Sequence, residues 1–166
     1  IVVTIEPEDY KKFASEGPLA GLRYQQALEK MAWEAGGKTQ TAPAQRLMDF
    51  VNKKVSKDLP SCSYIPGLKS VNLHDILPSF IADRLRKGFI QMGKKMKYYL
   101  HPDAIVVAPE SRTSSPVRIP RDPATLEHPQ VKGLYPCGEG AGYAGGIISA
   151  AIDGERVAEA VYLSNA

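Results

Sequence analysis

Apolar residues recur at helical spacing in three stretches of the first hundred residues. The first runs over residues 19–35 and stops at Gly36 and Gly37, and the second begins near Pro43, which suits a first helical turn. The third begins at Pro78. Each spacing predicts an amphipathic helix with one buried face. The residues expected on those faces are Leu28, Met31, Ala32 and Ala35, then Leu47, Phe50, Val51 and Val55, then Ile81, Leu85, Phe89, Met92 and Met96.

Extended patterns lie nearer the two ends of the chain. Runs rich in β-branched residues predict strands over residues 1–5 and 104–108, and a shorter one over 117–119. Residues 134–137 are expected to form the strand that leads into the glycine-rich stretch. Residues 56–71 have no clear period and are expected to form a loop, after which Asn72 or Asp75 caps a short helical turn. This pattern predicts an α+β fold, with a helical lobe over residues 10–100 inserted between strands of residues 1–9 and 101–166.

The most distinctive stretch is 134–151, which reads Leu-Tyr-Pro-Cys-Gly-Glu-Gly-Ala-Gly-Tyr-Ala-Gly-Gly-Ile-Ile-Ser-Ala-Ala. Five glycines leave little side-chain bulk between main-chain amides and an incoming ligand. A helix is predicted over 147–163, so its first amides and its positive dipole end would point toward the glycines. This arrangement indicates a cradle for an anion or a cofactor, although a plain α+β domain could carry it without a ligand.

The segment from Gly140 to Gly145 also matches the G-x-G-x-x-G fingerprint of dinucleotide-binding domains. In that fingerprint the acidic residue about twenty positions later ends a second strand. Glu159 is at the expected distance, but it lies inside the predicted final helix and no strand follows it. We therefore reject the dinucleotide interpretation and keep a strand end, a glycine turn and a terminal helix.

Together with Arg-Thr-Ser-Ser-Pro-Val-Arg-Ile-Pro-Arg-Asp over 112–122, and Ala-Ala-Ile-Asp-Gly over 150–154, this stretch resembles the carboxyl-terminal part of the bacterial FAD-dependent, or NAD(FAD)-utilising, dehydrogenases. The resemblance runs along most of the chain and is most specific from Arg112 to Gly154. It implies a second flavin-contact segment, with Glu139 accepting hydrogen bonds from the ribitol of FAD. The implied cofactor-binding residues are Gly138, Glu139, Gly140, Gly145, Gly146 and Ile147.

The resemblance also implies a larger parent protein. The strand–GxGxxG–helix that holds the ADP half of FAD is not encoded here, and the chain begins at Ile1 rather than Met. We expect the parent to supply that dinucleotide-binding domain as a partner, to bind FAD and a small-molecule substrate, and to take electrons from NAD(P)H as a candidate donor. The 166-residue chain is expected to be inactive alone.

A second candidate cluster lies in the loop between two predicted strands. Arg112, Ser114 and Ser115 combine a guanidinium with hydroxyls, a set that can hold a carboxylate, a phosphate or the flavin edge. Ser and Thr also cap ordinary turns, so the sequence favours a ligand-binding loop and a purely structural turn about equally. We assign no catalytic acid or base.

Charge and composition exclude several other classes of function. A net charge of +3 and a basic helix face without interleaved aromatics do not indicate a nucleic-acid partner. No apolar run is long enough for a membrane span, and Cys62 and Cys137 have no metal-ligand spacing. Cys137 is expected to be a buried strand-end residue, with a flavin-side thiol as the alternative. We expect a cytoplasmic parent without a metal site.

The sequence thus predicts a C-terminal fragment of an FAD-dependent oxidoreductase, in which a helical substrate-side lobe is inserted between strands of a partial FAD-binding domain. The alternative is a noncatalytic helical module for protein interaction or binding, with an incidental glycine-rich segment.

Overall fold

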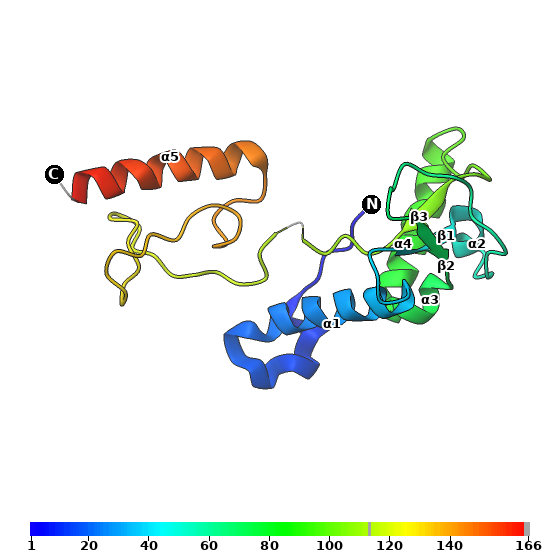
Figure 1. Cartoon of the computed structure of the whole chain (residues 1–166), viewed down its shortest axis with the longest axis horizontal. Helices are drawn as coiled ribbons and strands as arrows, with labels where there is room; N and C mark the ends of the chain where they lie inside the picture. Colours follow the sequence, from blue (N-terminus) through cyan, green and yellow to red (C-terminus); the bar gives the residue numbers. More distant parts are fainter. Residues whose placement is uncertain (113, 165–166) are drawn as a thin grey trace. The chain divides into compact units, whose positions relative to one another are not determined.

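The computed structural model describes residues 1–112 and 114–164. The described residues contain helices and a small mixed three-stranded sheet, which confirms the predicted α+β class. The elements in chain order are the 3-10 segment η1 (Pro7–Leu19), α1 (Ala20–Ala35), β1 (Ala42–Arg46), α2 (Leu47–Val51), β2 (Leu68–Ser70), α3 (Leu73–Ile76), α4 (Ser79–Lys95), β3 (Ile105–Val107) and α5 (Ile147–Ser164) (Figure 1).

The chain divides into two compact units. The first unit contains Ile1–Asp9 and Gln26–Pro109, and the second contains Tyr10–Gln25 and Glu110–Ala166. Each unit is therefore built from segments that are distant in the sequence. The expected functional division, with a substrate-side lobe over residues 10–100, stays a prediction.

The sheet of the first unit has the order β2-β1-β3. Strand β1 pairs with β2 in parallel and with β3 antiparallel. Its backbone is also bonded beyond these ladders, because the amide of Leu47 donates to the carbonyl of Ala104 at 2.8 Å. Helices α2 and α3 pack against this sheet, and α4 packs against α2 and α3 (Figure 1). The paired residues are Ala42 with Leu68, Pro43 with Lys69 and Ala44 with Ser70, and Ala44 with Val107, Gln45 with Val106 and Arg46 with Ile105.

The core of the first unit centres on Phe50, whose side chain is fully buried. Its ring meets Phe89 edge to face at 5.7 Å between centroids and stacks on His74 at 4.5 Å. Burying a large apolar side chain contributes about 1.5–3 kcal/mol, so this cluster is the main source of stability in the unit. The buried members of the cluster are Leu28, Leu47, Phe50, Val51, Leu73, Leu77, Ala82 and Phe89.

Several sequence predictions about the helices are confirmed. Helix α1 ends where Gly36 and Gly37 predicted: the amide of Gly37 donates to Glu34 and that of Lys38 to Trp33, the two bonds of a Schellman motif. Gly37 has a φ of 99°, which favours glycine. The Asn72 side chain caps α3, as predicted. Helix α4 follows Pro78, and α5 begins at Ile147, both as predicted.

The predicted helix start at Pro43 is wrong, because residues 42–46 form β1 and α2 begins only at Leu47. The missing amide hydrogen of proline is tolerated in this short strand, and the Pro43 carbonyl accepts from the Ala108 amide at 3.2 Å. Pairing on both sides outweighs the absence of β-branched residues. Three residues expected to be buried are exposed instead: Met31, Val55, which follows the end of α2, and Met96, which lies past the end of α4.

Three predicted strands are also wrong. Residues 1–5, 117–119 and 134–137 are irregular, because a strand needs a hydrogen-bonded neighbour and the sheet of the described residues contains only β1, β2 and β3. Ile1 and Val2 are exposed. The predicted strand over 104–108 is confirmed in a shorter form as β3.

Candidate functional site

The glycine-rich segment of the second unit folds as a tight turn before α5. The amide of Gly142 donates to the carbonyl of Glu139 at 2.9 Å, and the amide of Tyr143 donates to that of Gly138 at 3.0 Å. Gly142 has a φ of 83°, and a Cβ atom there would lie 2.7 Å from the carbonyl oxygen of Val117. Gly142 is therefore required by the fold itself, since the 117–118 segment passes directly against it.

A buried ion pair holds this turn onto α5. The guanidinium of Arg121 donates to both carboxylate oxygens of Asp153, at 2.9 and 2.6 Å, and to the carbonyl of Pro136 at 2.8 Å. The amide of Gly138 donates to the same carboxylate at 2.9 Å. The side chains of the pair are only 7% and 8% exposed. Bidentate pairing and full hydrogen bonding offset the cost of burying both charges.

The same contacts shift the pKa values of both partners. Hydrogen bonding from Arg121 lowers the pKa of Asp153 below 3.8, and the Gly138 amide adds to this effect while burial opposes it. Hydrogen bonding to Asp153 in turn raises the pKa of Arg121. The pair is thus fully ionised at neutral pH, and it acts as a structural clamp on the turn.

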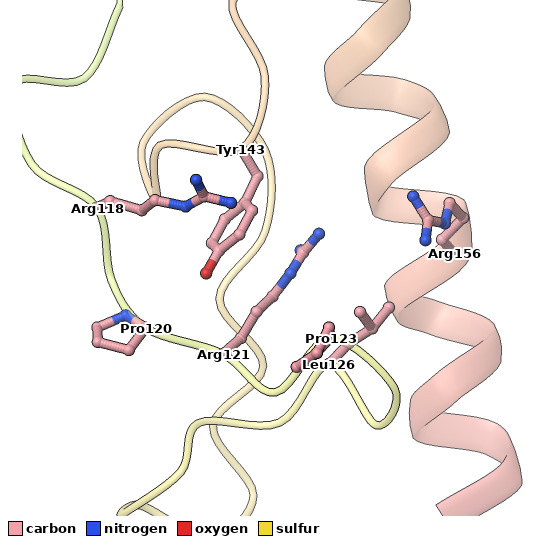
Figure 2. Close-up of a pocket in the computed structure, with 7 residues that line it drawn as sticks. All are labelled: Arg118, Pro120, Arg121, Pro123, Leu126, Tyr143 and Arg156. Atoms are coloured by element: carbon pink, nitrogen blue, oxygen red, sulfur yellow. The ribbon is translucent and has the colours of Figure 1, made fainter.

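Tyr143 connects the turn to the preceding loop. Its hydroxyl donates to the carbonyl of Ile119 at 2.9 Å, and the guanidinium carbons of Arg121 and Arg118 lie 3.6 and 4.3 Å from its ring centroid. Beside this ring is a pocket of about 450 Å³, shown in Figure 2. The residues lining it are Arg118, Pro120, Arg121, Pro123, Leu126, Tyr143 and Arg156.

The remaining glycines of the turn are not explained by packing within the chain. A Cβ atom at Gly140 or Gly145 would meet nothing within 4 Å, and neither residue has a φ in the region that favours glycine. The side chain of Glu139 is exposed beside them. Ile147 is 89% exposed at the first position of α5, where the amides have no partner within the helix. Glu139, Gly140 and Gly145 are therefore exposed members of the turn that precedes the start of α5.

The predicted cofactor residues are thus neighbours in one turn, and whether they bind a cofactor stays a prediction. Gly138 differs from the others because its amide is already engaged by Asp153 and its φ of 69° favours glycine. Gly146 is also partly engaged, since its amide donates to the Ser149 hydroxyl at 3.1 Å. Gly140, Gly145 and Glu139 are the members that the turn itself does not need.

The three residues of the second predicted cluster, Arg112, Ser114 and Ser115, have different surroundings. The Ser115 hydroxyl donates to the carbonyls of Val117 and Gly140, at 2.8 and 3.2 Å, so it ties the upstream loop to the glycine-rich turn. Arg112 and Ser114 are exposed, and the backbone amide of Arg112 is held by the Glu110 carboxylate at 2.8 Å. Ser115 therefore has a structural role, whereas a ligand-binding role for Arg112 and Ser114 stays a prediction.

Sequence reasoning missed the residues that organise this site, Arg121, Asp153 and Tyr143. The available signal was Asp153, a carboxylate one turn before Val157 on the helix face that becomes buried. A charged residue on a buried face requires a partner. The expectation for Cys137 was wrong: it is exposed, and Pro136 beside it is the buried residue.

Across residues 1–112 and 114–164, no group of three His, Cys, Asp or Glu side chains could hold a metal ion. The helices of that part of the chain are too short or too polar to cross a bilayer.

Two comparisons with known proteins bear on this site. The model of a family described as FAD-dependent protein, C-terminal domain-like, matches residues 1–113. An uncharacterized protein of Clostridium beijerinckii (strain ATCC 51743 / NCIMB 8052) is 45% identical over 161 residues, which are 96% of this chain and 30% of that protein. The chain therefore spans less than a third of the length of this relative. The family match ends before the glycine-rich turn, whereas the similarity to the relative includes it.

Proposed function

The chain belongs to the FAD-dependent protein, C-terminal domain-like family, and from this we propose that it is the C-terminal part of an FAD-dependent oxidoreductase of the dehydrogenase type. In this proposal a flavin performs the electron transfer, and the chain supplies one flavin-contact segment and part of the substrate side. The family match is the observation that carries the proposal. NAD(P)H is the proposed electron donor of the longer protein, for which we also propose a cytoplasmic location.

The glycine-rich turn is the proposed contact segment. Support comes from Gly140 and Gly145, which the turn does not need for its own packing or backbone conformation. Glycine at such positions suits the close approach of an external group to the backbone. The exposed helix start beside them presents amides and a positive dipole end, which suit the electron-rich atoms of a flavin or a phosphate. The residues present therefore fit FAD.

Glu139 is the proposed acceptor for the ribitol hydroxyls. It is the exposed carboxylate of the turn, and its backbone carbonyl already holds the Gly142 amide, so its position is fixed while its side chain faces solvent. A carboxylate accepts hydroxyl donors well and repels a pyrophosphate. This chemistry favours contact with the sugar-like part of FAD.

The test is a flavin titration of the longer protein that contains this chain. Glu139→Ala should weaken FAD binding about ten- to hundredfold, since a hydrogen bond to a charged group contributes about 1.5–3 kcal/mol. Glu34→Ala is the matched control, because Glu34 is an exposed carboxylate of α1 in the first unit and belongs neither to the turn nor to α5. Equal FAD affinity in both folded variants and in the parent would remove Glu139 from the site.

We further propose that the dinucleotide-binding part of the longer protein covers one face of α5. Several large apolar side chains of this helix are exposed, with Ile148 72% and Tyr162 74% exposed, and they lie among the exposed carboxylates Glu155 and Glu159. The relative of this chain is more than three times as long, so it contains additional sequence that could bury such a face. The apolar residues of the face are Ile147, Ile148, Ile152, Tyr162 and Leu163.

The isolated 166-residue chain gives a separate test of whether the dinucleotide-binding part of the longer protein is needed to bind FAD. It should bind FAD far more weakly than the longer protein and show no turnover, because the turn contacts only part of the cofactor. Fluorescence titration of both proteins measures the difference. Tight, stoichiometric binding by the chain alone would show that the partner is not needed.

Arg112 and Ser114 are proposed to contribute to the substrate side, as exposed donors suited to an anionic group. Arg112→Ala in the FAD-loaded longer protein should slow reduction or reoxidation with at least one electron donor or acceptor. Unaltered rates with every pair tested would make the loop purely structural.

A further inference from the structure

The pocket beside Tyr143 is the feature of the second unit that the proposed flavin contacts do not use. None of its lining residues belongs to the proposed contact set. We infer that this pocket binds a small organic anion, in which a carboxylate or phosphate group is attached to a flat apolar body. The inference goes beyond the proposed function, and it concerns a site that would be measurable whether or not FAD is bound.

The charges that line the pocket favour an anionic ligand. Three guanidinium groups line it, and Asp153 neutralises that of Arg121. Within the described residues, Arg118 and Arg156 form no ion pair, and both are exposed. Arg156 adds to the lowering of the Asp153 pKa only through charge attraction, after the hydrogen bonds. Two cations without a carboxylate partner therefore face one pocket, which favours an anionic guest.

The orientation of these cations suits an oxyanion. The guanidinium carbon of Arg118 lies over the Tyr143 ring, 4.3 Å from its centroid, and the exposed guanidinium keeps N–H donors available for a ligand. Figure 2 shows Arg156 projecting from α5 across the pocket from Arg118 and Tyr143. Both arginines line the pocket, and each offers N–H donors that suit a carboxylate or phosphate.

The apolar residues that line the pocket indicate what kind of body the anionic group of the ligand is attached to. Pro120 and Pro123 are exposed and offer apolar surface, whereas Leu126 is almost fully buried beneath the pocket lining. The volume of about 450 Å³ exceeds that of an inorganic anion and falls in the range of small-molecule sites. Apolar residues next to two cations therefore favour an acid with an apolar body, such as an aromatic acid, over free phosphate.

Hydrogen bonds and ring contacts fix the positions of two side chains that line the pocket, as a preformed site requires. Arg121 is fixed by Asp153 and the Pro136 carbonyl, and it lies 3.6 Å from the centroid of the Tyr143 ring. The Tyr143 hydroxyl is held by the Ile119 carbonyl. These contacts hold the aromatic wall in place before a ligand binds, which reduces the entropy lost on binding.

The experiment is isothermal calorimetry on the longer protein with four probes: benzoate, phenyl phosphate, inorganic phosphate and benzamide. Benzoate or phenyl phosphate should bind with one site per chain, and the stronger of the two identifies the preferred anionic group. Benzamide, which lacks the charge, and inorganic phosphate, which lacks the flat body, should bind at least about tenfold more weakly than the preferred probe.

Variants then assign the binding to this pocket. Arg118→Ala and Arg156→Ala should each weaken the preferred probe about ten- to hundredfold, and Arg118→Lys should recover only part of that loss. Lys132→Ala is the control, since Lys132 is an exposed cation of the same unit outside the pocket. Flavin absorbance, measured on each variant, should show an unchanged FAD content.

Four results would overturn the inference. They are no saturable binding of any probe, equal binding in the arginine variants and the control, inorganic phosphate binding as tightly as phenyl phosphate, and loss of FAD from the arginine variants. The last result would assign the two arginines to the cofactor. A Glu139→Ala variant that loses FAD but still binds the preferred probe would separate this site from the proposed flavin contact.

Discussion

The first unit buries a cluster of apolar side chains around Phe50, whereas the second is organised around the hydrogen-bonded pair of Arg121 and Asp153. Every buried member of the apolar cluster belongs to the first unit. The second unit buries a few scattered apolar residues, among them Leu126, Ala141 and Val157. Stability in the first unit therefore comes from apolar area removed from water, and in the second from hydrogen-bonded polar groups that shape a turn.

The largest expected effect comes from breaking the apolar cluster. Phe50→Ala should destabilise the first unit by about 3–5 kcal/mol, because it removes a fully buried ring and leaves a cavity between Phe89 and His74. Ile65→Ala, at a position 97% exposed in the same unit, should change stability by less than about 0.5 kcal/mol. Urea unfolding measures both, and similar values for the two variants would contradict the assignment of the core.

The next effect comes from breaking the ion pair. Asp153→Asn should cost about 3 kcal/mol, near the lower end for a broken buried pair, because the amide oxygen can still accept from Gly138. Glu155→Gln on the exposed face of the same helix is the control. Hydrogen exchange should show lost protection in α5 while α4 stays protected. Equal loss of protection in α5 and α4 would contradict the claim that the ion pair stabilises only the second unit.

Acid should act on the second unit through the same pair. The pKa of Asp153 is lowered by Arg121 in the folded state, so the stabilisation is fully present above about pH 4 and is lost as the pH falls through the folded pKa. Protection of α5 amides, corrected for the intrinsic exchange rate, should therefore fall with decreasing pH, and Asp153→Asn should flatten this dependence. An unchanged pH profile in the variant would remove the pair as its cause.

The smallest expected effect on stability comes from replacing single glycines of the turn with alanine. Gly142→Ala should cost about 1–3 kcal/mol, since φ is 83° and the added Cβ would press on the Val117 carbonyl. Gly140→Ala should leave stability nearly unchanged, because its surroundings are open. Thermal unfolding of the two variants measures the difference. If both lose equal stability, Gly140 is also a requirement of the fold.

Sequence reasoning succeeded where a local pattern determines the structure. The Gly36-Gly37 stop of α1, the start of α4 after Pro78 and the start of α5 at Ile147 each depend on residues within one or two turns. It failed at β1, because Ala-Pro-Ala-Gln-Arg carries no strand signal of its own and becomes a strand only by pairing with β2 and β3.

The candidate site was predictable to a similar extent. The glycine-rich turn and the exposed Glu139 follow from local composition. The Arg121–Asp153 pair joins residues 32 positions apart, and no spacing rule connects them. The pocket also escaped prediction, because Arg118, Tyr143 and Arg156 meet only after that pair has brought the turn onto α5.

The most direct test of the central claim, that the glycine-rich turn contacts FAD, is the FAD dissociation constant of the longer protein carrying Gly145→Ala. The structure offers open space for the added methyl group, so folding stability should not change. If the backbone of the turn approaches the cofactor, the methyl group occupies that space and the affinity should fall about tenfold or more, equivalent to at least about 1.4 kcal/mol. An unchanged dissociation constant in the stably folded variant would contradict the claim.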